Sequence, residues 1–220
     1  MLGGLFYPKG TPEKPISFES LFIPYIYKEI YLEGLYLDIF NQKPLESMTV
    51  LDVGANIGVV TQYMQPYAKN LYAIEPCSYH YQALEKNIEF NEWKNVHPFR
   101  MAIADKDGEM DLHLFDQNKT CQSLVNNYPG ETEKVKTQTF ATFMKENNID
   151  TIDFCKFDVE GAEDLILPSE GFTSVANRIK AIEIEFHYSS FPELVNHMIK
   201  LGFQARRYES SAIVVLFTRN

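Results

Sequence analysis

Short apolar runs and longer amphipathic segments alternate between residues 49 and 103. Strands are expected at Thr49–Val53, Leu71–Ile74 and Val96–Ile103, and helices at 58–66 and 78–90, the second capped by Ser78. Strands that alternate with helices over short links form a parallel sheet. We therefore expect three parallel strands with helices packed against them.

The α/β rhythm is interrupted between residues 105 and 140. Asp107-Gly108 marks a turn, and Met110, Leu112 and Leu114 alternate with polar residues, which predicts an exposed antiparallel strand. Residues 119–134 are polar and loop-like, and a further strand is expected at 135–140. We interpret this block as an insertion beside the sheet.

The last third of the chain completes the sheet. Strands are expected at 152–157 and 181–186, helices at 161–167 and 191–201, and a final hairpin at 203–208 and 212–218, joined by residues 209–211. The pattern predicts a Rossmann-like, doubly wound α/β domain. Its mostly parallel seven-stranded sheet would end in an antiparallel hairpin.

The N-terminal segment differs from this pattern. Residues 1–15 are rich in Gly and Pro and are expected to form an irregular arm. Within residues 17–41, apolar residues recur at steps of three or four, which predicts a helix that either packs on the core or forms a lid over a substrate pocket. We divide the chain into an N-terminal arm and helix at 1–44 and an α/β domain at 45–220.

Charge and composition exclude several classes of partner. The 220 residues include 30 acidic and 20 basic side chains, a formal net charge of −10, without a cluster of Lys or Arg, so no nucleic acid is expected as a partner. Three cysteines without metal-ligand spacing predict reduced thiols in a cytoplasmic protein. No apolar run approaches the roughly 20 residues that span a bilayer, so no membrane is expected as a partner either.

The strongest motif is Leu51-Asp52-Val53-Gly54-Ala55-Asn56-Ile57-Gly58, directly after a strand and before a helix. Gly54 allows a sharp turn and close approach to a ligand, and Gly58 allows the helix to pack closely on the strand. The N–H groups of the loop and of the helix N-terminus favour an anionic group, such as the carboxylate of S-adenosylmethionine. Asp52 would then face the cationic end of that cofactor, which makes Asp52, Gly54, Asn56 and Gly58 candidate cofactor residues.

A second acidic residue strengthens the prediction of a nucleoside cofactor. Glu75 ends the next strand, where a carboxylate can accept hydrogen bonds from both ribose hydroxyls. A dinucleotide fingerprint would instead require glycine at the positions of Asn56 and Val59. A nicotinamide-dependent oxidoreductase is therefore the weaker alternative.

Ala104 and Asp105 follow the third expected strand and are candidates to border the adenine ring. Asp105 would accept a hydrogen bond from the exocyclic amine of the adenine. The alternative is that Asp105 merely begins the turn at 105–108.

The segment Lys156-Phe157-Asp158-Val159-Glu160-Gly161-Ala162-Glu163 places three carboxylates at the end of the fourth strand of the domain. Like charges held close raise one another's pKa, which suits proton abstraction, and Lys156 would offset this if its side chain turns the same way. Helix capping also explains Glu160 and Glu163, but explains Asp158 less well.

The fifth strand carries Glu183, Glu185 and His187 on one face, because they recur at a two-residue period. His187 is either a base that reaches a substrate hydroxyl or a hydrogen-bonded strand-end residue. A divalent metal bound by some of Asp158, Glu160, Glu185 and His187 is a further alternative, although the pattern does not require one and none is expected.

These motifs together resemble the FkbM-type methyltransferases. The resemblance rests on residues 50–58, on Ala73-Ile74-Glu75-Pro76 and, most diagnostically, on residues 156–163, and it covers roughly residues 49 to 187. It implies the class I methyltransferase version of the Rossmann-like fold, with S-adenosylmethionine as cofactor. Asp52, Gly54, Asn56, Gly58 and Glu75 then become cofactor residues, and Asp158 and Glu160 lie near the transferred methyl group.

The resemblance also implies O-methylation of a hydroxyl on a sugar, glycolipid or small metabolite. Asp158, Glu160 and His187 are the candidate bases, and Asp158 is also a candidate cofactor contact. The helix at 17–41 and the loop at 116–134 are the expected specificity elements. A cofactor-binding protein without catalysis is the alternative from another class.

Overall fold

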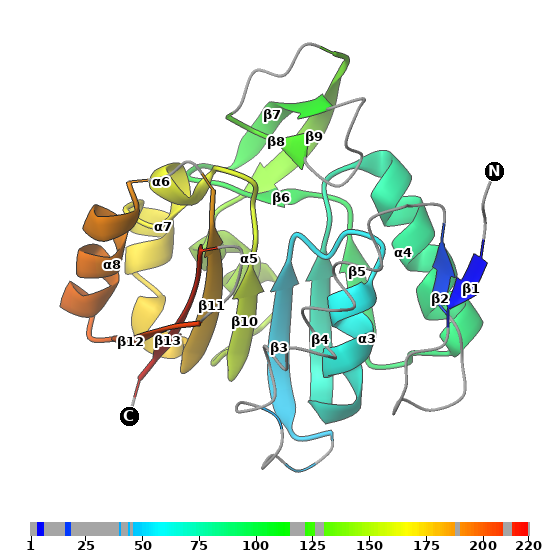
Figure 1. The fold of residues 1–220 in the computed structure, drawn as a ribbon, viewed down its shortest axis with the longest axis horizontal. Helices are drawn as coiled ribbons and strands as arrows, with labels where there is room; N and C mark the ends of the chain where they lie inside the picture. The colour runs from blue at the N-terminus through cyan, green and yellow to red at the C-terminus, as the bar shows by residue number, and fades with distance from the viewer. Residues whose placement is uncertain are drawn as a thin grey trace.

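The computed structural model describes residues 4–6, 16–18, 40, 44, 46–114, 122–125, 130–187, 190–208 and 213–219. Seven strands form the large sheet, in the order β12-β13-β11-β10-β3-β4-β5 (Figure 1). Their bounds are β3 Met48–Val53, β4 Ala68–Ile74, β5 Val96–Phe99, β10 Phe154–Phe157, β11 Ala181–Phe186, β12 Gln204–Arg207 and β13 Ile213–Thr218. Neighbours from β5 to β11 pair in parallel, whereas β13 is antiparallel to both β11 and β12. The expected mixed α/β sheet is therefore confirmed.

Helices cover both faces of this sheet. They are α3 Val59–Met64, α4 Ser78–Asn91, α5 Phe140–Glu146, α6 Glu163–Ile166, α7 Glu170–Thr173 and α8 Phe191–Lys200, with 3-10 turns η2 Gln65–Tyr67 and η3 Ala176–Arg178. Buried side chains of α5 to α8 form one apolar cluster with the sheet, and those of α3, α4 and Phe40 form the other.

Side chains along β10 alternate between the two faces of the sheet, and this alternation places the charged side chain of Lys156 within the core. Phe154 belongs to the cluster beneath α3 and α4, whereas Cys155 and Phe157 belong to the opposite cluster. Because successive strand residues point to opposite faces, Lys156 shares the face of Phe154. The strand thus directs one ammonium group toward the side of the sheet on which α3 lies.

A four-stranded sheet stands above the carboxyl ends of the large sheet (Figure 1). It consists of β6 Ala102–Ile103, β7 Gly108–Leu114, β8 Gln122–Ser123 and β9 Thr132–Gln138, in the order β6-β9-β7-β8. This confirms the insertion predicted for the middle of the chain. Two stretches of the expected specificity loop, 116–121 and 126–129, lie outside the described residues.

The single strand expected at 96–103 is wrong. The chain leaves the large sheet after Phe99, where the N–H of Met101 donates to the carbonyl of Phe99 and makes a tight turn. Ala102 and Ile103 then pair with β9 in the small sheet. Both parts of the segment 96–103 are apolar, so the hydrophobic pattern alone gives no sign of the turn after Phe99.

The strand expected at 135–140 is shifted, because β9 begins at Thr132, within the segment expected to be a loop, and helix α5 was not predicted. β9 ends at Gln138, and the hydroxyl of Thr139 caps α5 by accepting a hydrogen bond from the N–H of Thr142. Similarly, Ser78 is not the cap of α4. Cys77 occupies that position, and Ser78 is the first helical residue.

At the N-terminus, two expectations need correction. β1 Gly4–Phe6 pairs antiparallel with β2 Ile16–Phe18, so the arm is partly a strand and the expected helix does not begin at Ser17. Pairing with β1 places residues 16–18 in a strand, ahead of the apolar residues on which the helical prediction rests. Phe40 is helical and buried, and the rest of the expected helix lies outside the described residues. The division at residue 44 stays a prediction.

Among the helices that the structure describes, none is long and apolar enough to cross a membrane.

Gly58 provides a test of how α3 and α4 pack. Its φ is +96°, and a Cβ there would lie 2.8 Å from Leu84 Cδ1 on α4. Gly58→Ala should therefore lower the free energy of unfolding by more than the roughly 1–3 kcal/mol of backbone strain alone. In a protein that already carries Leu84→Ala, Gly58→Ala should lower the free energy of unfolding only by the cost of backbone strain. Urea unfolding of the wild-type protein, the two single variants and the double variant measures both penalties, and an equal penalty in both backgrounds contradicts the packing explanation.

Candidate functional site

The carboxyl ends of β3, β4 and β10 open into a pocket. Five of the predicted site residues line it: Gly54, Asn56, Glu75, Asp158 and Glu160. The small sheet and its loops supply another wall through Ala102, Ile103, Leu112, Gln122 and Leu124. The pocket is therefore polar on the side of the large sheet and largely apolar on the side of the insertion.

Gly54 is required by a close approach within the protein. Its φ is +79°, and a Cβ at this position would overlap the backbone carbonyl oxygen of Asp158. The sequence explanation, close approach to a ligand, therefore needs a correction. The end of β10 packs so closely on the loop after β3 that only glycine fits there, although Gly54 also lines the pocket.

The loop between β3 and α3 does not offer free N–H groups. Those of Gly54 and Ala55 donate to the carbonyl of Ile74, that of Ile57 to Asn56 Oδ1, and that of Gly58 to the carbonyl of Ala55. The N–H of Asn56 donates to Glu75 Oε2 at 2.8 Å. The expected anion cradle of loop N–H groups is thus wrong for this geometry, because each donor from residue 54 to residue 58 already has an acceptor.

Glu75 is oriented by two backbone donors. Its Oε2 accepts from Asn56, and its Oε1 accepts from the N–H of Cys77 at 2.9 Å. The side chain is almost fully buried yet lines the pocket. A carboxylate held in this way presents its remaining lone pairs in a fixed direction, which suits ligand hydroxyl groups.

His80 is a pocket residue that the sequence analysis missed. Its Nδ1 lies 3.7 Å from Glu75 Oε1. Burial lowers the pKa of His80, but contacts with Cys77 and Glu75 outweigh burial and raise the pKa to about 10. The only sequence signal was its place in the first turn of the helix that follows Glu75.

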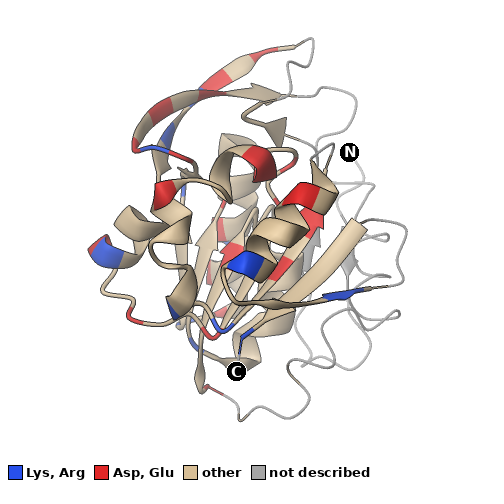
Figure 2. Ribbon diagram, turned by 90° about the vertical axis from the view of Figure 1, so that its left-hand side faces the viewer, with Lys and Arg blue, Asp and Glu red and all other residues tan. Residues whose placement is uncertain are grey.

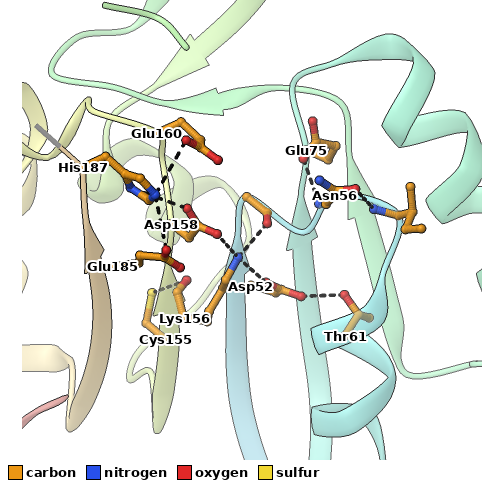
Figure 3. A network of polar contacts seen from close by, with 12 residues as sticks. Asp52, Asn56, Thr61, Glu75, Cys155, Lys156, Asp158, Glu160, Glu185 and His187 are labelled. Atoms are coloured by element: carbon orange, nitrogen blue, oxygen red, sulfur yellow. Dashed lines mark hydrogen bonds and ion pairs between the residues drawn. The ribbon is translucent and has the colours of Figure 1, made fainter. Parts of the chain in front are cut away.

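Asp52 lies beneath the loop and does not line the pocket (Figure 3). It is fully buried, its Oδ2 accepts from Thr61 Oγ1 at 2.6 Å, and its Oδ1 lies 4.0 Å from Lys156 Nζ. Burial raises the pKa of Asp52, while Lys156 and Thr61 act to lower it. Asp52 therefore supports the site through Lys156 and Thr61.

Lys156 connects the two strand ends that form the pocket floor (Figure 3). Its ammonium donates to the carbonyl of Gly54 at 2.8 Å and to Asp158 Oδ2 at 3.0 Å. Burial would lower the pKa of Lys156, but the charges of Asp158 and Asp52 outweigh burial and raise it. The expectation that Lys156 offsets the acidic turn is confirmed.

The imidazole of His187 does not line the pocket and lies among four carboxylates, of which Figure 3 labels Asp158, Glu160 and Glu185. Nε2 is 3.4 Å from Glu185 Oε1 and 3.6 Å from Glu160 Oε2, and Nδ1 is 3.3 Å from Glu163 Oε1 and 3.9 Å from Asp158 Oδ1. Burial lowers the pKa of His187, but Glu163 and Glu185, followed by the other two carboxylates, raise it to about 12. In this arrangement the ring already carries a proton at neutral pH, which does not suit a base.

Three other candidates lie away from the pocket lining. Gly58 packs against Leu84, and Ala104 donates its N–H to the carbonyl of Gln138. Asp105 follows Ala104, beyond the pocket-lining residues of β6. The early end of β5 explains the shift, because it puts Ala102 and Ile103 where residues 104 and 105 were expected.

Two groups of side chains have donor atoms placed as in metal sites. One is Glu75, Cys77 and His80, and the other is Asp158, Glu185 and His187, with the donor atoms of each group within 4.8 Å of one another. The sequence analysis expected acidic residues to lie close to His187, and the second group shows that Asp158 and Glu185 do so.

Several solved structures that resemble this chain are methyltransferases. A methyltransferase FkbM from Methylobacillus flagellatus has a TM-score of 0.53 at 15% identity, over 79% of this chain and 44% of that chain. A candidate methyltransferase from Streptococcus mutans in complex with S-adenosylhomocysteine (SAH) has a TM-score of 0.53 at 14% identity, over 86% and 97%. An rRNA methylase from Streptococcus thermophilus has a TM-score of 0.53 at 10% identity, over 86% and 95%. At such identities the likeness shows the fold, a class I methyltransferase-like α/β fold.

The sequence comparison is more specific. No curated protein matches this chain. Residues 52–205 match the family described as the methyltransferase FkbM domain, and this range contains the loop after β3, Glu75 and the acidic turn after β10. The chain therefore belongs to the FkbM methyltransferase domain family, whose members are S-adenosylmethionine-dependent methyltransferases.

Proposed function

We propose that this protein transfers a methyl group from S-adenosylmethionine to a hydroxyl oxygen of a sugar, glycolipid or small metabolite. The observation that carries the proposal is the set of carboxylates at the strand ends: Glu75 after β4, and Asp158 and Glu160 after β10, all lining one pocket. Family membership supplies the class of reaction, and it leaves the nicotinamide alternative without support.

Three parts of the pocket match three parts of S-adenosylmethionine: its ribose, its cationic end and its adenine. Glu75 is positioned to accept hydrogen bonds from ribose hydroxyls. Asp158 and Glu160 line the pocket with carboxylates, which favour a positively charged group, such as an ammonium or a sulfonium. The apolar wall from β6, β7 and the loop after β8 suits the adenine.

When bound, S-adenosylmethionine supplies a methyl group that leaves the sulfonium for an attacking oxygen, with SAH as the other product. The residues of the chain hold the reactants in line, which in favourable cases supplies roughly 7–11 kcal/mol of the barrier. Asp158 or Glu160 takes the proton of the acceptor hydroxyl, because both line the pocket and His187 does not.

Charge supports a small or carbohydrate acceptor. The net charge is −10, although acidic and basic positions both occur along the four-stranded sheet beside the pocket (Figure 2). A net negative charge of this size disfavours a nucleic-acid acceptor. Calorimetric titration with S-adenosylmethionine and with nicotinamide dinucleotides tests the cofactor, and SAH release over a panel of sugars and hydroxylated metabolites tests the acceptor.

The cofactor site predicts the effect of one substitution. Glu75→Gln removes the charge and one acceptor oxygen, so it should weaken S-adenosylmethionine binding by about 1–3 kcal/mol. Calorimetry measures the loss, with Glu109→Gln on the exposed edge of β7 as the control that should bind normally. Unchanged affinity in a folded Glu75→Gln protein would refute the ribose assignment.

The base assignment predicts a kinetic effect. Asp158→Asn or Glu160→Gln should slow methyl transfer roughly 10²–10⁴-fold on the best acceptor, because the hydroxyl proton then lacks its acceptor. SAH release at saturating cofactor measures turnover, and calorimetry monitors cofactor binding separately. If both variants keep near-normal turnover, catalysis in this pocket depends on alignment alone.

A further inference from the structure

The charged side chains around Lys156 and His187 include more carboxylates than cationic groups. Lys156 and His187 face five carboxylates, those of Asp52, Asp158, Glu160, Glu163 and Glu185. The side chain of Glu163 is fully buried and its Oε2 has no hydrogen-bond partner, and Asp158 Oδ1 is likewise buried without one. Buried carboxylate oxygens without partners are costly, so this arrangement fits a bound cation.

We propose that Asp158, Glu185 and His187 bind one divalent cation of the Mg²⁺ or Mn²⁺ class. One donor atom of each residue lies within 4.8 Å of the others. Ligands about 2.1 Å from a shared ion lie roughly 3–3.5 Å apart. The 3.4 Å between His187 Nε2 and Glu185 Oε1 fits this spacing and is long for a hydrogen bond.

Glu163 takes the position of an orienting residue for such a site. A ligating imidazole usually donates its other N–H to a carboxylate, which fixes the ring. Glu163 Oε1 lies 3.3 Å from His187 Nδ1 and also accepts the N–H of Gly161 at 3.2 Å. Nε2 thereby faces Glu185 and Glu160, whereas Asp158 Oδ1 lies 3.9 Å from Nδ1. A cation that takes Nε2 as a ligand would replace the proton that the ring otherwise carries.

The donor set identifies the class of cation. Carboxylate oxygens outnumber the single imidazole nitrogen, and neither of the cysteines that the structure describes, Cys77 and Cys155, belongs to the group. Such a set suits Mg²⁺ or Mn²⁺ better than Zn²⁺, which favours nitrogen and sulfur.

The role of the cation rests on the proposed function, although the site itself does not. Asp158 both lines the pocket and belongs to the donor group, so the cation would lie at the pocket wall. There it would bind the acceptor through oxygen and favour the deprotonated hydroxyl. Glu160, which also lines the pocket, would remain to take the proton.

Titration of the full chain with Mn²⁺, without cofactor, tests the site by calorimetry and by electron paramagnetic resonance. We expect one saturable site, weakened at least about tenfold by His187→Gln and by Glu185→Gln. His80→Gln is the matched control, because it removes the imidazole of the other candidate group, and it should bind Mn²⁺ normally. Glu185 is about one-third exposed (32%), so its variant should fold even if His187→Gln does not.

Absence of saturable Mn²⁺ binding to the wild-type protein overturns the proposal. So does binding that is lost in His80→Gln but kept in folded Glu185→Gln. Parallel titration with S-adenosylmethionine separates the two proposals. Cofactor binding without Mn²⁺ binding refutes the cation site alone, whereas Mn²⁺ binding without cofactor binding refutes the proposed function alone.

Discussion

The buried ammonium of Lys156 is the interaction on which the arrangement of the site depends. Register places Lys156 between Asp52 on β3 and Glu183 on β11, in the middle of the parallel strands. An ammonium in this position is tolerated because the carbonyl of Gly54 and the carboxylate of Asp158 accept its protons. The same contacts hold the loop after β3 against the end of β10, which is why only glycine fits at position 54.

This packing determines the chemical character of the pocket. The backbone donors of the loop are used within the protein, one of them to orient Glu75. The polar groups that line the pocket therefore include three carboxylates, those of Glu75, Asp158 and Glu160, and the opposite wall is largely apolar. A pocket that accepts hydrogen bonds and positive charge on one side and covers an apolar ring on the other suits a cationic nucleoside.

The insertion is coupled to the acidic turn. Ser123 on β8 donates to the backbone carbonyl of Glu160 at 2.7 Å, and Glu133 on β9 accepts from the N–H and hydroxyl of Ser78 at the start of α4. The small sheet is thus bound to elements on two sides of the pocket. Its residues combine a structural role with formation of the pocket wall.

The sequence by itself determined the order of the main strands, the glycine loop, Glu75 and the acidic turn, because each depends on local periodicity or on residues adjacent in the chain. Only the tertiary structure decided that β5 ends at Phe99, that Asp52 lies beneath the loop, and that His187 is surrounded by carboxylates. These outcomes depend on partners far along the chain, such as β9 for Ala102 and Lys156 for Asp52. A one-dimensional pattern indicates which face a side chain occupies, but not which charges from other strands meet it there, and those charges determine its protonation and its role.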